Sequence, residues 1–268
     1  MSETKNGFTK FDTIDEFKTW LNTRKVYRTI NKLQVHHTYA PSYDQWPEDE
    51  FTRQYNMKKY HMETNQWDNI AQHFTIFPNG KILTGRSLNT TPIGIKGWNT
   101  NVICIEIYGN FDERKDIIKT EQKEAVIACY ALLCKKFNII PSIDTIRCHC
   151  WFDSKGTYLG DYNSDKSCKT CPGNNFMEIG NSKSAFVKNF YPKVKEYMDG
   201  SRFYNLGIYR VIVDELNIRK GPGIEYGVVG RIRDKGSYTI VKVYGSWGCL
   251  KSGRGWINIS GDYCSRVR

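Results

Sequence analysis

The spacing of apolar residues changes near Asp199-Gly200-Ser201, and this change most limits how the chain can fold. Before it, apolar runs alternate with longer amphipathic segments, whereas short alternating segments separated by glycine-rich turns follow it. We therefore expect a mixed α/β domain over residues 1–200 and a small all-β barrel over residues 204–268. A chain of 268 residues is long enough for both.

Three short apolar runs predict strands in the first domain. The first run, LQVHH at 33–37, ends in two histidines. The second, HFTIF at 73–77, is closed by the turn 78–80, and the third, VICIEIY at 102–108, contains one carboxylate, Glu106. Runs of this length and composition are typical of buried strands. An acidic side chain in such a strand is unusual, which makes Glu106 a candidate functional residue.

Three longer segments predict helices that flank this sheet. Residues 121–137 follow Thr120 as a possible N-cap, and Pro192 is expected to kink or split a helix over 186–198. Residues 9–22 predict an amphipathic helix whose apolar face holds Phe11, Ile14, Phe17, Trp20 and Leu21. Strands separated by helices indicate a mixed α/β fold.

Charge and hydropathy narrow the possible partners. Lys and Arg outnumber Asp and Glu by 39 to 28, a net charge of +11, which favours an anionic partner such as nucleic acid, membrane or cell wall. The basic residues are scattered and no helix-turn-helix or zinc-finger pattern is present, so nucleic acid is not expected. No apolar run approaches the roughly 20 residues of a membrane span and no secretory signal is visible, so we expect no membrane insertion and a cytoplasmic location.

The chain has nine cysteines, and without a secretory signal these are expected to bind metal or to pack rather than to form disulfides. Cys129 and Cys134 fall on the buried face of the predicted helix 121–137. Whether Cys249 pairs with Cys264 does not follow from the sequence.

Two metal sites fit the segment 147–173, where Cys148 and Cys150 flank His149 and are followed by Cys168 and Cys171. In a structural site, Cys148 or Cys150 would join Cys168 and Cys171 in a closed zinc centre. In a catalytic site, His149 and Cys171 would join a distant histidine and leave one position for water.

The distant histidine comes from a pair. His36 and His37 are neighbours on a predicted strand, so their side chains point to opposite faces and only one can bind a given metal. Strand geometry does not say which. His61 and His73 are expected to be packing residues.

Four motifs carry a resemblance to a known family: VHHT at 35–38, QHFTIFPNGKILTGR at 72–86, ICIEIYGNFD at 103–112, and CHCWFD followed by KTCPG. Together they make residues 33–176 similar to the type 2 N-acetylmuramoyl-L-alanine amidases, zinc enzymes related to phage lysozymes of the amidase type and to peptidoglycan-recognition proteins. The order and spacing of the motifs make the match specific. The resemblance implies a central mixed sheet with Zn²⁺ at one edge.

The same resemblance implies roles for five residues. His36, His149 and Cys171 would bind zinc, Glu106 would act as general base, and Lys169 would stabilise the oxyanion. Glu106 also fits a hydrogen-bonded structural carboxylate, and Lys169 a solvated loop lysine.

Gln72 departs from the family pattern, because other relatives have a tyrosine there that assists catalysis. Glutamine cannot exchange a proton, which increases the weight on Glu106. Candidate substrate contacts are His37, Gln72, Trp46, Trp67 and Trp98, and the three tryptophans fit a packing role as well.

Residues 216–222 (LNIRKGP) and 255–257 (GWI) resemble bacterial SH3-type cell-wall-binding modules. This resemblance implies a small barrel that binds peptidoglycan through Tyr226, Trp247 and Trp256, although Trp256 fits the core equally well.

These features predict a zinc-dependent peptidoglycan hydrolase that cleaves the amide bond between N-acetylmuramic acid and L-alanine. We expect a phage or prophage endolysin, held in the host cytoplasm until a separate holin-type pore releases it. One alternative is a non-catalytic peptidoglycan receptor of the same fold, which typically lacks the cysteine ligand. Another is an enzyme that cuts a different amide bond of the stem peptide.

Overall fold

The computed structural model describes residues 2–46, 49–199, 207–244 and 246–267. The chain divides into two compact units, Met1–Lys195 and Glu196–Arg268, which are described separately. Gly200 and Ser201 of the predicted boundary, and the predicted start of the second domain at residue 204, lie outside the described residues.

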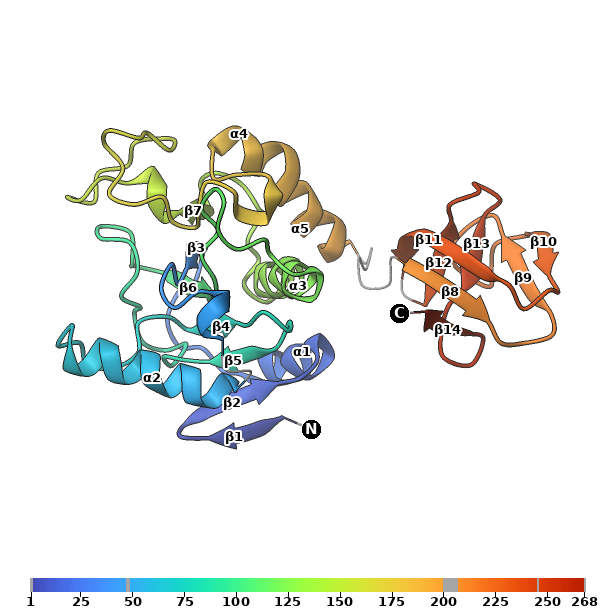
Figure 1. The fold of residues 1–268 in the computed structure, drawn as a ribbon, viewed down its shortest axis with the longest axis horizontal. Helices are drawn as coiled ribbons and strands as arrows, with labels where there is room; N and C mark the ends of the chain where they lie inside the picture. Colours follow the sequence, from blue (N-terminus) through green and yellow to red (C-terminus); the bar gives the residue numbers. More distant parts are fainter. Residues whose placement is uncertain (1, 47–48, 200–206, 245, 268) are drawn as a thin grey trace. The chain divides into compact units, whose positions relative to one another are not determined.

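The first unit is built on one mixed seven-stranded sheet (Figure 1). In spatial order its strands are β1 (Glu3–Lys5), β2 (Phe8–Phe11), β5 (Ile82–Thr84), β4 (Phe74–Ile76), β6 (Val102–Ile107), β3 (Lys32–His37) and β7 (Ile146–Cys148). Strands β4, β6, β3 and β7 run parallel, and the remaining pairs are antiparallel. The mixed α/β class predicted for this domain is confirmed.

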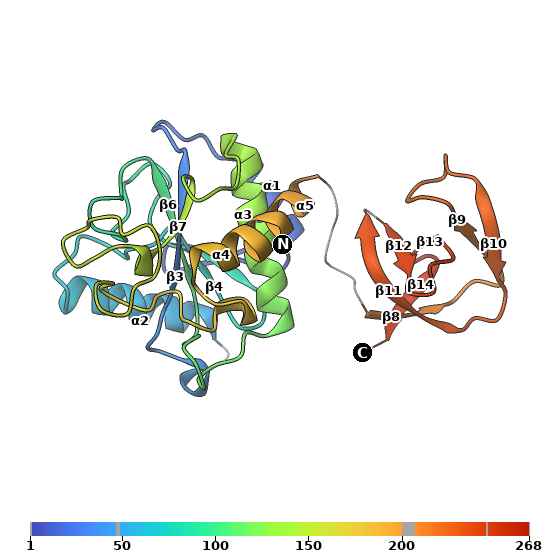
Figure 2. The same ribbon diagram turned by 90° about the horizontal axis from the view of Figure 1, so that it is seen from above.

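Helices cover both faces of this sheet, which explains why its parallel strands are almost continuously apolar. Helix α3 (Thr120–Phe137) packs with α1 (Ile14–Thr23) on one side, and α2 (Glu50–Glu63) lies on the other side (Figure 2). Helix α3 is buried along most of its length, including Cys129 and Cys134 as predicted. No helix among the described residues is both long and apolar enough to cross a membrane.

The first predicted helix begins later than expected. Phe11 belongs to β2, where it pairs with Ile82, and α1 begins at Ile14 after Thr13, whose side chain accepts the N–H of Glu16. Phe11 still packs against Phe17 of α1, with ring centroids 5.4 Å apart. Phe11 therefore fitted the apolar pattern of the helix because it contacts the helix from a neighbouring strand.

Of the two other helix predictions, the N-cap needs correction and the break near Pro192 is confirmed. Lys119 is the N-cap of α3, and Thr120 is its first helical residue. The last helical region comprises α4 (Lys183–Ala185), a π-helical turn (Phe186–Phe190) and α5 (Tyr191–Met198). The helical region is thus split directly before Pro192, as predicted, because proline has no N–H to donate to the carbonyl four residues earlier, which lies in the π-helical turn.

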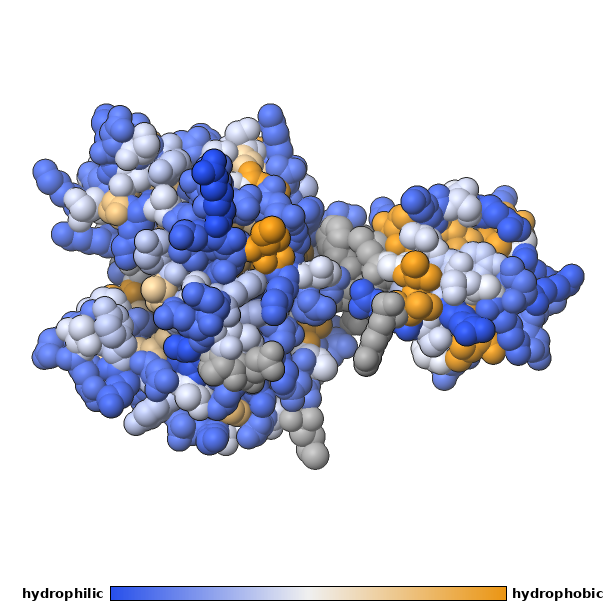
Figure 3. All heavy atoms as spheres, viewed as in Figure 1, coloured by the Kyte–Doolittle hydropathy of each residue, from blue (hydrophilic) through white to orange (hydrophobic). Residues whose placement is uncertain are grey.

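The second unit is a seven-stranded sheet of antiparallel neighbours, and every regular element in residues 207–244 and 246–267 is a strand. The spatial order is β10 (Val228–Ile232), β9 (Leu216–Arg219), β13 (Trp256–Asn258), β12 (Trp247–Leu250), β11 (Ser237–Tyr244), β8 (Gly207–Val211) and β14 (Cys264–Val267). Ile218, Leu250 and Ile257 are central in its apolar core. Hydrophilic residues cover most of the face of each unit seen in Figure 3.

Candidate active site

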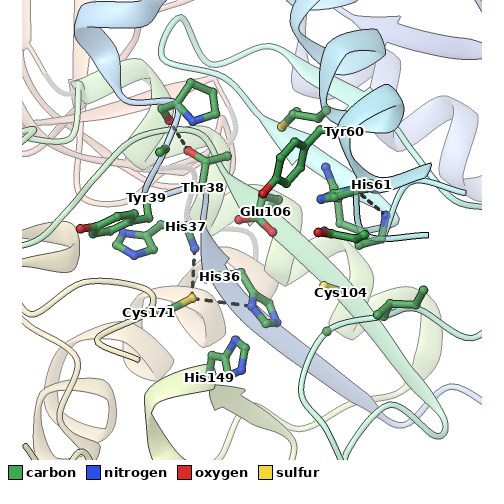
Figure 4. A pocket seen from close by; sticks show the side chains of 18 of the residues that line it. His36, His37, Thr38, Tyr39, Tyr60, His61, Cys104, Glu106, His149 and Cys171 are labelled. Atoms are coloured by element: carbon green, nitrogen blue, oxygen red, sulfur yellow. Dashed lines mark hydrogen bonds between the residues drawn. The ribbon is translucent and has the colours of Figure 1, made fainter. Parts of the chain in front are cut away.

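The site forms where three neighbouring parallel strands end. His36 and His37 close β3, Glu106 is the next-to-last residue of β6, and His149 follows β7 directly in a short 3₁₀ turn (His149–Trp151). The register pairs His36 with Glu106. Since the ends of parallel strands meet at one edge of a sheet, residues far apart in the sequence come together here (Figure 4).

His36, His149 and Cys171 form the metal-ligating group of this site. One potential ligand atom from each lies within 4.8 Å of the other two. The Sγ of Cys171 is 3.6 Å from Nδ1 of His36, and the rings of the two histidines have centroids 5.0 Å apart. His36 and Cys171 are buried, while His149 is half-buried.

The structure distinguishes the two adjacent histidines. His37 presents its backbone N–H, not its ring, to Cys171, with a distance of 3.4 Å from N to Sγ. Its ring Nδ1 accepts the N–H of Phe111 at 3.2 Å, and the side chain borders the neighbouring cavity. Because neighbouring residues of a strand point to opposite faces, only the ring of His36 faces His149 and Cys171.

The alternative cysteine-only zinc site finds no support among the described residues, where Cys148, Cys150 and Cys168 belong to no group that could hold a metal. The Sγ of Cys150 is instead 3.7 Å from the carbonyl of Asn181, to which it donates.

Two imidazoles and one thiol are a donor set that suits zinc, whose ligand bonds of about 2.0–2.3 Å require ligand atoms close together. Burial lowers the pKa of His36 well below its ordinary value and that of His149 to about 4, so both rings are neutral at neutral pH and have a free lone pair. Burial raises the pKa of Cys171 well above its usual range, so its thiolate requires a nearby cation. The three residues therefore fit Zn²⁺.

Glu106 points into the pocket beside this group (Figure 4). Burial raises the pKa of its carboxyl to about 8, although the charge of Lys169 lowers it. Lys169 is exposed but lines the same pocket. A carboxyl that titrates near neutrality beside a fixed positive charge is suited to proton transfer.

The pocket is a cavity of about 1130 Å³. Its far wall comes from α2 and the turn after it, through Arg53, Asn56, Tyr60 and Trp67. Sequence reasoning missed the first three, because polar residues on an amphipathic helix look the same whether they face solvent or a cleft.

Of the other predicted substrate contacts, Gln72 and Trp67 line the cavity. Gln72 is buried, and its Nε2 donates to Oγ1 of Thr75 at 2.9 Å. Its Oε1 has no hydrogen-bond partner among the described residues.

Trp46 and Trp98 are not among the residues that line the cavity, and their contact with substrate stays a prediction. Trp46 stacks on Phe77, with centroids 5.2 Å apart, and packs against an apolar cluster of the first unit. Trp98 packs on Phe152 and lies under the side chains of Lys32 and Arg147.

The remaining histidines, His61 and His73, each accept a backbone N–H within the first unit. His61 borders the cavity but uses Nδ1 to accept the N–H of Ala71 at 3.2 Å. His73 is buried and accepts the N–H of Cys104 at 3.0 Å.

In the second unit, the strand registers place Trp247, Trp256 and Arg219 on the same outward face. The Arg219 guanidinium carbon is 5.9 Å from the Trp247 ring centroid. Tyr226 is exposed and packs over Gly221, where a Cβ would lie 2.4 Å from its ring. All three predicted wall-binding residues are thus at least partly accessible.

Known proteins similar to this chain include amidases and peptidoglycan-recognition proteins. A family model described as N-acetylmuramoyl-L-alanine amidase matches residues 26–174. Among curated proteins, the human N-acetylmuramoyl-L-alanine amidase is 31% identical over 30% of this chain, and peptidoglycan-recognition protein SC2 of Drosophila melanogaster is 31% identical over 29%. The matched segments make up 14% and 42% of those proteins, so the chain spans less than half of either.

Among solved structures, the N-acetylmuramoyl-L-alanine amidase LysC from Clostridium intestinale is 24% identical. It aligns over 60% of this chain and 85% of its own, with a TM-score of 0.42. The family model covers more than half of the chain and includes every residue of the metal-ligating group. The chain belongs to the N-acetylmuramoyl-L-alanine amidase family.

Proposed function

We propose that this protein is a zinc-dependent hydrolase that cleaves the amide bond between N-acetylmuramic acid and L-alanine of peptidoglycan. The observation that carries the proposal is the metal-ligating group beside Glu106 in the cavity of an amidase-family domain. Cys171 also favours catalysis over the receptor alternative, since a complete ligand set is needed only for metal chemistry.

The proposed reaction is an amide hydrolysis. His36, His149 and Cys171 would hold a zinc ion, which would supply Lewis-acid polarisation of the amide carbonyl and activation of water. Glu106 accepts the proton of the attacking water and transfers it to the leaving nitrogen, so that a C–O bond replaces the C–N bond. Lys169 stabilises the negative charge that develops on the carbonyl oxygen.

The proposed substrate groove lies between the strand ends and α2. Trp67 and Tyr60 offer aromatic faces for a sugar ring or peptide, and His37 and Gln72 offer polar contacts. The unpartnered Oε1 of Gln72 can accept a substrate N–H.

We assign the second unit to wall binding as an SH3-type module acting through Tyr226, Trp247 and Trp256. Its exposed aromatic rings and basic side chains suit peptidoglycan, and a tethered binder raises the local concentration of the enzyme. We further propose a bacteriolytic endolysin that reaches the wall from the host cytoplasm through a separate holin-type pore. Coexpression with and without such a pore tests this route: lysis that needs no pore would contradict it.

The decisive experiment digests purified peptidoglycan and identifies the new amino terminus while zinc content is measured. The wild type is expected to bind one zinc and release N-terminal L-alanine. Cys171→Ala should lose both zinc and activity, whereas Glu106→Gln should keep zinc and lose activity. Cys168→Ala, a half-buried cysteine of the same loop outside the ligand group, is the matched control and should keep both.

Three outcomes would contradict the proposal. Absence of any new amine would favour the receptor, and a terminus other than L-alanine would show that another bond is cut. Full zinc content in Cys171→Ala would show that the ligand assignment is wrong.

A further inference from the structure

Gln34 is a fully buried polar residue directly behind the metal-ligating group. It precedes His36 by two positions on β3 and therefore lies on the same face of the sheet. Its Oε1 is 3.1 Å from Nε2 of His36. Gln34 does not line the cavity and cannot touch a substrate there.

The contacts of the Gln34 side chain determine which way its carboxamide points. Nε2 donates to the carbonyl of Trp98 at 3.0 Å and to Oδ1 of Asn99 at 3.1 Å, while Oε1 accepts the N–H of Ile95 at 3.3 Å. A flipped carboxamide would set oxygen against the Trp98 carbonyl and NH₂ against the Ile95 N–H. The oxygen of Gln34 therefore faces His36.

This orientation determines the tautomer of His36. Because the Gln34 oxygen can only accept, Nε2 of His36 must carry the proton that it donates. A neutral ring then has its lone pair on Nδ1, the atom that lies 3.6 Å from Sγ of Cys171. The lone pair is thus directed to the position where the metal-ligating group converges.

The loop 94–99 surrounds the Gln34 carboxamide closely. Oδ1 of Asn99 accepts both from Gln34 and from the N–H of Gly94, the latter at 3.0 Å. A Cβ at Gly94 would lie 1.9 Å from Oε1 of Gln34, so only glycine fits there without displacing the carboxamide.

We propose that Gln34 is a positioning residue that holds His36 in the Nε2–H tautomer and so sets the zinc affinity of the site. The inference rests on the proposed zinc site. A neutral carboxamide adds no negative charge, so a bound zinc with one thiolate keeps a net positive charge and remains a strong Lewis acid. The protein thereby orients its ligand without weakening the electrophile.

The test measures zinc affinity by chelator competition in the full-length protein. Gln34→Met keeps the size of the side chain but removes the acceptor, and should weaken zinc binding by roughly 10–100-fold. Gln54→Met is the matched control, since Gln54 is equally buried but lies on α2 and donates to the carbonyl of Thr84. The zinc affinity of this variant should equal that of the wild type. Asn99→Ala loosens Gln34 without altering it and should give a smaller loss.

Nitrogen-15 NMR of the imidazole side chains supplies a second readout that needs no variant. Zinc-loaded wild type should show a protonated Nε2 and an unprotonated Nδ1 in His36. A proton on Nδ1 would overturn the proposal, and so would zinc affinity in Gln34→Met within twofold of the wild type. If Gln34→Met fails to fold, two other results together would overturn the proposal. These are unchanged zinc affinity in Asn99→Ala and a proton on Nδ1 of His36 in the wild type.

These outcomes are separable from the proposed function. Zinc binding that depends on Gln34 in a protein that cleaves no peptidoglycan would leave this inference standing and remove the enzyme. Peptidoglycan cleavage by a protein whose zinc affinity does not depend on Gln34 would keep the enzyme and remove this inference.

Discussion

Single residues in this site have pKa values that differ from those of the same groups in water. The histidines are neutral, the thiol requires a cation, and Glu106 titrates near neutrality because it is buried. Motif order made His36, His149, Cys171 and Glu106 predictable from the sequence. Gln34 was not predictable, because nothing distinguishes it from other polar residues until β3 and the loop 94–99 are placed together.

The dependence of activity on pH should report Glu106. A general base acts when deprotonated, so activity should rise as pH increases through the pKa of its carboxyl. Lys169 lowers that pKa, so Lys169→Met should move the rising limb to higher pH and reduce kcat by roughly 100–1,000-fold through loss of oxyanion stabilisation. Pre-steady-state rates over a pH series with soluble muropeptide measure both effects.

Lys166→Met provides the control, since Lys166 is exposed in the same loop and does not line the cavity. Its profile should match that of the wild type. A rising limb that persists in Glu106→Gln at unchanged pH would assign the proton transfer to another group.

His73 should make the protein sensitive to acid. Burial lowers its pKa to about 3, whereas the same residue titrates near 6.5 in the unfolded chain. A folded pKa below the unfolded one gives stability that is present above pH 6.5 and is lost as pH falls towards 3. His73 alone should cost up to about 2.7 kcal/mol between pH 6.5 and 4.5, from 1.36 kcal/mol per pKa unit.

Denaturant unfolding of metal-free protein at several pH values measures this loss. His73→Gln should be less stable at pH 7, since the Cys104 N–H loses its acceptor, but its free energy of unfolding should fall less steeply on acidification. Equal slopes for the variant and the wild type would show that other groups cause the acid sensitivity.

At the scale of elements, the strands were more predictable than the helix ends. The apolar runs that became β3, β4 and β6 are buried on both faces, so their composition alone identified them. The segment 9–22 misled because Phe11 packs on α1 from a neighbouring strand, and such a contact can imitate helical periodicity. The ring contacts of Trp46 and Trp98 were not predictable, because both pack on residues distant in sequence.

The loop that presents Cys171 should depend on Gly173. This residue has φ of +107°, and a Cβ there would lie 2.3 Å from the carbonyl oxygen of Phe111. Gly173→Ala should lower the free energy of unfolding by roughly 3 kcal/mol or more and weaken zinc binding, since the backbone next to Cys171 must move. Chemical unfolding and zinc titration measure the two effects.

Gly160→Ala is the control that shows how much of the lost free energy of unfolding comes from backbone strain alone. Gly160 has φ of +85°, but a Cβ there would have no atom within 4 Å, so about 1 kcal/mol and normal zinc affinity are expected. Similar losses in the two variants would show that the contact with Phe111 is unimportant.

At the scale of the whole molecule, the chain forms two compact units, and the second has an apolar core of its own. We expect a core substitution in one unit to leave the chemistry of the other intact. Ile218→Ala should destabilise the second unit by about 2–5 kcal/mol, since Ile218 is fully buried. Cleavage of soluble muropeptide should be unchanged, while lysis of intact walls should fall.

Calorimetry and the two activity assays test this expectation together. Val229→Ala, at a residue that is 47% exposed, should change neither stability nor lysis measurably. Loss of muropeptide cleavage in Ile218→Ala would indicate that the units depend on each other for folding.

The meeting of β3, β7 and the Cys171 loop at one edge also has a thermodynamic consequence. His36 lies near the beginning of the first unit, whereas His149 and Cys171 lie near its end, so one ion would cross-link segments that are distant along the chain. Such a cross-link removes far more conformational freedom from the unfolded chain than from the folded one. Zinc supply would then control how much of the protein is folded, with a melting temperature that rises with the free zinc concentration.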